Sequence, residues 1–306
     1  MLGPFLETLI GGLLTGVLYS LVALGFVLIF KASGVFNFAQ GAMVLFAALS
    51  FARLSEFMPL PLALLLAIVV MVALAYAVEF LVLRHLVNQE GIILFMATLG
   101  IAYFLEGFGQ TVWGSDIYKI RLGLPTNPIF LFESVFPGGI LIDPSELIAA
   151  TICGLLVLVL ALFFQVTRVG RALRAVADDH QAAQSVGIPL NQIWLVVWAV
   201  AGLVALVAGI MWGTKLGVQF SLSLVALKAL PVLILGGFTS IPGAIVGGLI
   251  IGAGEKLAEV MLAPVLIRTF DLAGGGIENW FAYVLALVFL LFRPQGLFGE
   301  RIIERV

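Results

Sequence analysis

The stretch TRVGRALRAVADDHQAAQSVGIPLNQ, residues 167–192, is a polar island in a chain that is otherwise almost entirely apolar. One apolar run ends on it at Gln165, and the next begins at Ile193. Apolar residues recur at helical spacing on one side and charged residues on the other, which predicts an amphipathic helix. The apolar side holds Ala172, Leu173, Val176 and Ala177, and the polar side holds Arg171, Arg174, Asp178 and Gln181. An ordinary connecting loop is the alternative interpretation.

Two residues predict where this helix ends. Gly187 is placed for a left-handed cap, because glycine adopts positive φ without steric cost. Pro189, two residues further on, prevents the helix from resuming. Asp178 with Gln181 offers an alternative, a capping-box-like pair that begins a second short helix. In either case the segment is predicted to lie against the membrane or against a partner protein.

Composition places the rest of the chain in a lipid bilayer. Of its 306 residues, 62% are hydrophobic and only 10% are charged, which excludes a soluble globular domain. The apolar runs are long and continuous, without the alternation of barrel strands, so the spans are predicted to be helices. No segment is polar and long enough to be separate, so residues 1–306 are predicted to form one transmembrane domain of an all-α polytopic protein.

A helix needs about 20 apolar residues to cross the hydrocarbon region. By this measure we predict eight or nine transmembrane or half-spanning helices. The expected segments are residues 5–30, 36–54, 60–83, 92–113, 146–166, 193–213, 224–238, 241–262 and 279–293.

The apolar run 224–262 is too long for one helix, and the glycines at 236 and 237 break it. Thr239 or Ser240 is predicted to cap the helix that follows, with Pro242 in its first turn. The short piece before the break is predicted to enter the membrane without crossing it.

Orientation follows from the Lys and Arg residues of the loops. Three arginines within residues 168–174 and a basic tail with Arg301 and Arg305 favour the cytoplasm for 167–192, with the N-terminus outside. The longest loop, 114–145, is then external and is predicted to form an ordered cap over the outer opening of the helix bundle. Its rigid and aromatic residues are Pro125, Pro128, Pro137, Pro144, Phe130, Phe132 and Phe136.

Small residues four positions apart predict close helix packing, because they let two backbones approach. The pairs are Gly12 with Gly16, Ala205 with Gly209, Gly243 with Gly247, and Gly248 with Gly252.

Polar residues inside membrane spans are energetically costly in lipid and usually face the interior of the helix bundle or a water-filled pathway. Asn37 and Gln40 lie about one turn apart at the start of the second span, and Glu106 and Gln110 are four apart in the fourth. We interpret these four as candidates for a translocation path; hydrogen bonds between helices are the alternative.

Two further ionisable residues receive structural interpretations. Glu79 is predicted to form an ion pair with Arg84 near the inner boundary, and Lys228 is predicted to snorkel toward the interface.

Catalytic and metal motifs are not found in the sequence. No GxxxxGK[ST] phosphate loop, no HExxH motif and no nucleophile beside a base is present, and the chain has one cysteine and two histidines. The chain is therefore predicted not to be an enzyme and to hold no cofactor or metal of its own.

Four blocks carry a resemblance to a known family. GRALRAVADDHQAAQSVGIPLNQIWLVVWAVAGLVALVAGIMWG (170–213) resembles the cytoplasmic loop and following span of LivH-like permeases of branched-chain amino acid ABC importers. The blocks 24–41, LGFVLIFKASGVFNFAQG, 96–114, MATLGIAYFLEGFGQTVWG, and 228–255, KALPVLILGGFTSIPGAIVGGLIIGAGE, are similar to further blocks of that family in the same order.

The resemblance implies a transporter subunit in a bacterial or archaeal cytoplasmic membrane. Its partners would be a second permease, two cytoplasmic ATPases that use ATP, an external solute-binding protein and the bilayer, with no nucleic acid. The segment 167–192 would be the coupling helix. Its implied ATPase contacts are Gly170, Arg171, Arg174, Asp178, Asp179, Ala182, Ala183 and Gly187.

Two departures from the family pattern leave the ligand open. Many relatives have an acidic residue where this chain has Ala42, and many have an uncharged residue where it has Glu106. A urea or amide permease is therefore an alternative within the class, and a proton-coupled secondary transporter using Glu106 is an alternative outside it.

Overall fold

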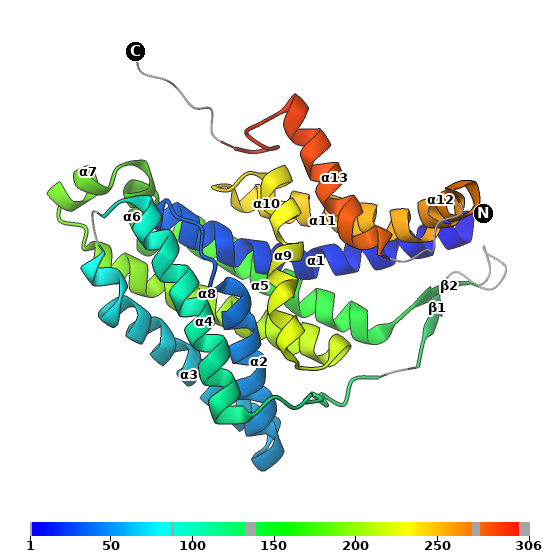
Figure 1. Ribbon diagram of the computed structural model, residues 1–306, viewed down its shortest axis with the longest axis horizontal. Coiled ribbons are helices and arrows are strands. Elements are labelled where there is room, and N and C mark those ends of the chain that lie inside the picture. Colours follow the sequence, from blue (N-terminus) through cyan, green and yellow to red (C-terminus); the bar gives the residue numbers. More distant parts are fainter. Residues whose placement is uncertain (1, 87–88, 126, 132–138, 271–275, 300–306) are drawn as a thin grey trace. The chain divides into compact units, whose positions relative to one another are not determined.

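The computed structural model describes residues 2–86, 89–125, 127–131, 139–270 and 276–299 (Figure 1). Phe132, Phe136 and Pro137 of the expected external cap, and Arg301 and Arg305 of the basic tail, lie outside these residues. The helices in chain order are α1 (Leu2–Ser33), α2 (Gln40–Phe57), α3 (Leu60–Leu81), α4 (Gly91–Trp113), α5 (Pro144–Val166), α6 (Arg168–Asp178), α7 (His180–Ser185), α8 (Leu190–Leu216), α9 (Val225–Lys228), α10 (Leu230–Gly236), α11 (Ile241–Leu257), α12 (Ala263–Phe270) and α13 (Ile277–Phe292).

The chain folds into two compact units. One contains Met1–Ala23, Gly123–Leu155 and Lys228–Val306, and we call it the first unit. The second unit contains Leu24–Leu122 and Leu156–Leu227. The expectation of one transmembrane domain stays a prediction.

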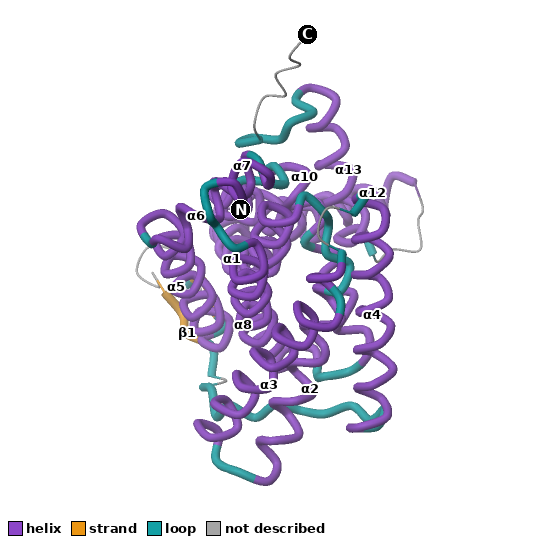
Figure 2. The backbone as a smooth tube through the Cα atoms, turned by 90° about the vertical axis from the view of Figure 1, so that its left-hand side faces the viewer, coloured by secondary structure: helices purple, strands orange, loops and turns teal. Residues whose placement is uncertain are grey.

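Each predicted span is mostly helical, and Figure 2 shows that helices make up most of the described chain. Among them, α1, the helical stretch Leu60–His85, α4, α5 and α8 are long and apolar enough to cross a membrane, and a sixth span results if the bent pair Phe220–Gly236 and Ile241–Phe270 counts as one. The expected eight or nine also include α2, which carries Arg53 and Glu56, and the short α13 of 16 residues.

The second helix begins four residues later than predicted. α2 starts at Gln40, because the Asn37 carboxamide oxygen accepts a hydrogen bond from the Ala39 N–H at 3.0 Å. A short polar side chain that bonds the backbone two residues on favours a turn over a helix.

In the second unit, α8 packs along α2 and α3. The predicted small pair of α8 allows this approach: a Cβ atom at Gly209 would lie 2.5 Å from the Val44 carbonyl oxygen of α2. α2 is enclosed on all sides here, since every one of its residues from Gln40 to Ala52 is buried. Close backbone contact of this kind replaces the hydrophobic driving force that lipid removes.

In the first unit, the beginning of α1 packs against α11 through glycines on both helices. A Cβ atom at Gly12 would lie 2.8 Å from the Gly252 carbonyl oxygen, and one at Gly16 would lie 2.5 Å from that of Gly248. Gly247 lies equally close to α10, at 2.7 Å from the Val232 carbonyl oxygen by the same measure. The glycine pairs predicted from spacing therefore mark real helix contacts.

The predicted break between α10 and α11 is confirmed. Gly237 adopts φ +104°, and the helical segments on either side are bent by 114°. Ser240 accepts a hydrogen bond from the Gly243 N–H at 3.0 Å, and Pro242 lies in the first turn. After α13 the chain returns to this break, where the Leu297 N–H donates to the Leu235 carbonyl at 2.8 Å. This bond satisfies a terminal carbonyl of α10.

The loop 114–145 contains a small hairpin that the sequence did not predict. β1 (Ile129–Leu131) pairs antiparallel with β2 (Ile140–Ile142), and Phe130 lies opposite Leu141. The loop is ordered at this point, and α5 begins just after it.

Candidate functional sites: the α6–α7 segment and a buried charge cluster

α6 is the amphipathic helix that the spacing predicts. The Thr167 hydroxyl begins it by accepting a hydrogen bond from the Gly170 N–H at 3.2 Å. Leu173 and Val176 are buried, whereas Arg171, Arg174 and Asp178 are exposed. The side chain of Gln181, predicted for the polar face, lies outside the described part of the chain.

A second short helix, α7, follows directly, and its cap is Asp179. The Asp179 carboxylate accepts a hydrogen bond from the Ala182 N–H at 2.9 Å, whereas Asp178 is the last residue of α6. The predicted Asp178–Gln181 pair was one position early, because the chain turns between the two aspartates.

The end of α7 is the predicted left-handed cap. Gly187 adopts φ +86°, and the Ile188 N–H donates to the Ala183 carbonyl at 3.0 Å. This six-to-one bond is typical of a Schellman motif. Pro189 then precedes α8. Both short helices are thus closed at defined residues.

Two arginines of α6 bind the end of α5, a contact that the sequence pattern does not predict. Arg174 donates from Nη1 to the Phe164 carbonyl at 2.8 Å and from Nη2 to the Gln165 carbonyl at 3.3 Å. Arg171 donates from Nη1 to the Val166 carbonyl at 3.1 Å. Cations suit the last carbonyls of a helix, where the dipole is negative. The guanidinium groups therefore fasten α6 to α5.

The residues expected to contact an ATPase differ in their accessibility. Gly170 and Ala183 are buried, and a Cβ atom at Gly170 would collide with the Phe164 backbone. These two residues position the segment by packing. The exposed members are Arg171, Arg174, Asp178, Asp179, Ala182 and Gly187. Val186, which the prediction omitted, directly follows the last residue of α7, and 77% of its surface is exposed.

The candidate path residues do not form one cluster in the described chain. Asn37 and Gln40 are completely buried, and Asn37 Nδ2 lies 3.4 Å from Gln40 Oε1. Glu106 is half-buried and Gln110 exposed on α4, and no described hydrogen bond or ion pair joins them to Asn37 or Gln40. A role in the path stays a prediction for all four.

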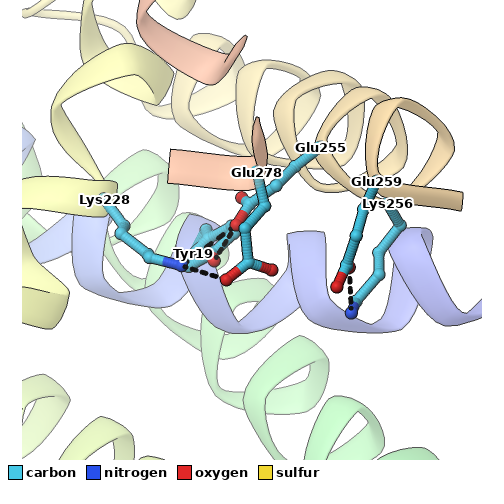
Figure 3. Close-up of polar contacts among 6 residues, drawn as sticks. All are labelled: Tyr19, Lys228, Glu255, Lys256, Glu259 and Glu278. Carbon is cyan, nitrogen blue, oxygen red and sulfur yellow. Dashed lines mark hydrogen bonds and ion pairs between the residues drawn. The ribbon is translucent and has the colours of Figure 1, made fainter. Parts of the chain in front are cut away.

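A partly buried charge cluster in the first unit was not predicted as a site. We call it the Lys228 cluster; it consists of Tyr19, Lys228, Glu255 and Glu278 (Figure 3). Lys228 Nζ lies 3.1 Å from Glu255 Oε1 and 3.9 Å from Glu278 Oε1. The Tyr19 hydroxyl donates to the same Glu255 oxygen at 3.1 Å. The snorkelling of Lys228 stays a prediction, and the structure adds a partner for it, the buried carboxylate of Glu255 on α11.

Two other ion pairs of the described chain can be compared with the Lys228 cluster. Lys256 Nζ lies 2.9 Å from Glu259 Oε2 one turn along the same stretch, with both side chains about two-fifths exposed (Figure 3). The predicted pair of Glu79 with Arg84 is confirmed at 3.7 Å. A search for ionisable residues within apolar spans would have found Glu255, since such residues normally have a partner.

Residues 8–293 match the family described as "branched-chain amino acid transport system / permease component". The chain belongs to this family of permeases. It is therefore the permease component of a branched-chain amino acid ABC transport system, a multi-pass membrane protein of a bacterial and archaeal family. It is a transport protein and not an enzyme, as the sequence predicts.

Similar proteins cover the whole permease. The chain is 29% identical to the high-affinity branched-chain amino acid transport system permease protein BraD of Pseudomonas aeruginosa, over 99% of this chain and 98% of BraD. It is 26% identical to LivH of Escherichia coli K12, over the same shares.

A match to a sugar permease is weaker. The chain is 25% identical to the fructose import permease protein FruF of Bifidobacterium longum, over 90% of this chain and 75% of FruF.

Among solved structures, PsaBC from Streptococcus pneumoniae in complex with Fab is similar with a TM-score of 0.47 and 17% identity, covering 96% of this chain and 97% of that chain.

Proposed function

We propose that this permease imports branched-chain or other aliphatic amino acids and is driven by ATPase subunits that dock on α6 and α7. The observation that supports the proposal is the structure of the α6–α7 segment. It is polar outside, apolar inside, capped at both ends and bonded to the end of α5. When a partner protein displaces such a segment, the displacement is transmitted to the membrane helix α5.

The two α6 arginines give this transmission a physical route. Because Arg171 and Arg174 hold the last carbonyls of α5, α6 cannot tilt without pulling on that helix. ATP binding in the partners would shift the population between two arrangements of the transmembrane helices. The free energy comes from ATP in the partner subunits.

The complete transporter would contain a second homologous permease, two cytoplasmic ATPases and an external solute-binding protein. The names of BraD and LivH support branched-chain amino acids as the ligand class. The similarity to FruF supports a fructose-like sugar as a second candidate ligand. Urea or an amide is a third candidate that the sequence departures leave open.

The docking surface is tested by charge reversal on α6. Arg168 is exposed at the start of this helix, and Lys119 is exposed in the loop predicted on the opposite side of the membrane. We expect Arg168→Glu combined with Val186→Asp to lower recovery of the ATPases about tenfold in a mild-detergent pull-down, since each change places a carboxylate on the docking face.

Lys119→Glu is the matched control and should recover the ATPases like the unmodified chain. Leucine uptake by the reconstituted complex is measured beside the pull-down. Full ATPase recovery with the double variant would show that the partners dock elsewhere.

A further inference from the structure

We propose that Lys228 and Glu278 form a site for the charged head group of a zwitterionic α-amino acid. This inference rests on the proposed function and deepens it, because it assigns residues that select amino acids over uncharged ligands such as sugars or amides.

The Lys228 cluster has a fixed inner part and an accessible outer part. Glu255 is 6% exposed and shares one oxygen between Tyr19 and Lys228, with both contacts at 3.1 Å. Lys228 and Glu278 are 34% and 32% exposed, and their charged atoms are 3.9 Å apart. That distance is too long for a hydrogen bond. Lys228 is thus held firmly by Glu255 and only loosely by Glu278, so a ligand can exchange with the loose contact.

The charges of the cluster favour a ligand with both signs. One ammonium faces two carboxylates, so the ionised cluster carries an excess of negative charge (Figure 3). A ligand with only a carboxylate meets repulsion from Glu278, and an uncharged ligand leaves the loose pair as it is. The α-ammonium of an amino acid complements Glu278, while its α-carboxylate complements the remaining donors of Lys228.

The position of Lys228 at the interruption between α9 and α10 supports a ligand site. Lys228 ends α9 just before the short α10, and Glu255 lies on α11 beyond the break. Interrupted helices at membrane depth occur where they are buried in protein or line a water-filled cavity. In transporters, such interruptions commonly hold the substrate or coupling ion. Ionisable side chains inside a membrane mark such paths by default.

The test measures binding of radiolabelled L-leucine to the assembled complex in nanodiscs, without the solute-binding protein. We expect Glu278→Gln to weaken binding at least tenfold, because the variant keeps the shape of the side chain and the Lys228–Glu255 bond but removes the partner of the ammonium. The double variant Lys256→Gln with Glu259→Gln removes a neighbouring ion pair as a matched control, and its binding should stay within twofold of wild type.

A displacement series on the wild-type complex needs no variant. Unlabelled L-leucine should displace the label, 3-methylbutan-1-amine should displace it more weakly, and 4-methylpentanoate and 4-methylpentanamide should not displace it. Equal displacement by 4-methylpentanamide, absence of leucine binding, or unchanged binding by Glu278→Gln would each overturn the site.

The proposed function has a separate readout. ATP-driven uptake of L-leucine by the complete wild-type complex, with its solute-binding protein, tests the transporter itself. Uptake together with an unaffected Glu278→Gln variant would overturn the head-group site alone. No uptake of leucine would overturn the proposed function.

Discussion

At the scale of single residues, a buried carboxylate in a span depends on the partners that surround it. Glu255 lies on a glycine-rich helix and would be costly there alone. Lys228 and Tyr19 both contact its Oε1, and these contacts join residues that are 27 and 236 positions away in the chain. The neighbouring Lys256–Glu259 pair joins residues three positions apart and is half-exposed, so it contributes much less to the stability of the folded chain.

These two pairs predict different responses to removal of the carboxylate. We expect Glu255→Ala to destabilise the chain by about 3 kcal/mol, because it leaves Lys228 and Tyr19 without their buried acceptor. Glu259→Ala should cost about 0.5 kcal/mol, as exposed ion pairs do. Thermal stability of the purified chain in detergent measures both. Equal loss in the two variants would contradict the distinction.

At the scale of elements, close contact between helices depends on glycine at particular positions. A Cβ atom at Gly252 would lie 2.5 Å from the Gly12 carbonyl oxygen and from the Gly16 Cα atom of α1. Backbone atoms cannot move aside as a flexible side chain would. Gly11, one residue from Gly12, has no atom within 4 Å of such a Cβ position.

This difference gives a prediction for α1 and α11. We expect Gly252→Val to destabilise the helix pair by about 3 kcal/mol through overpacking, with a lower yield of folded protein. Gly11→Ala should be neutral or should stabilise α1 by up to about 1 kcal/mol, since alanine is the better helix former. Size-exclusion profiles and melting temperatures report the outcome, and a well-folded Gly252→Val variant would show that the contact is not tight.

At the scale of the whole molecule, the source of free energy separates an ATP-driven importer from a proton-coupled carrier. A carrier needs a titratable group in the path, and Glu106 is the candidate from the sequence. Glu106 is half-buried on α4, and only 22% of an 18-residue apolar stretch of this helix is buried. That low burial leaves most of α4 to lipid or to a second subunit.

We therefore expect Glu106→Gln to keep ATP-driven leucine uptake within about twofold of wild type, because an ATP-driven importer needs no proton-carrying group there and the amide keeps the size of the side chain and one accepting oxygen. The measurement uses proteoliposomes that contain the complete complex, with uptake compared with and without ATP. Uptake that follows a pH gradient without ATP and disappears in Glu106→Gln would instead establish the secondary transporter.

Composition and local sequence patterns are enough to predict the class of this protein and the local features of its helices. Continuous apolar runs predict membrane helices, and a cap or break is encoded by a few adjacent residues, as Ser240, Gly187 and the amphipathic spacing of α6 show. Which distant groups meet is visible in the folded chain alone. Lys228 with Glu255, and Arg174 with the Phe164 carbonyl, depend on how helices pack, and no local pattern records that choice. Periodicity reports which face of a helix is apolar, whereas the partner of a buried charge is set by the helix that covers it.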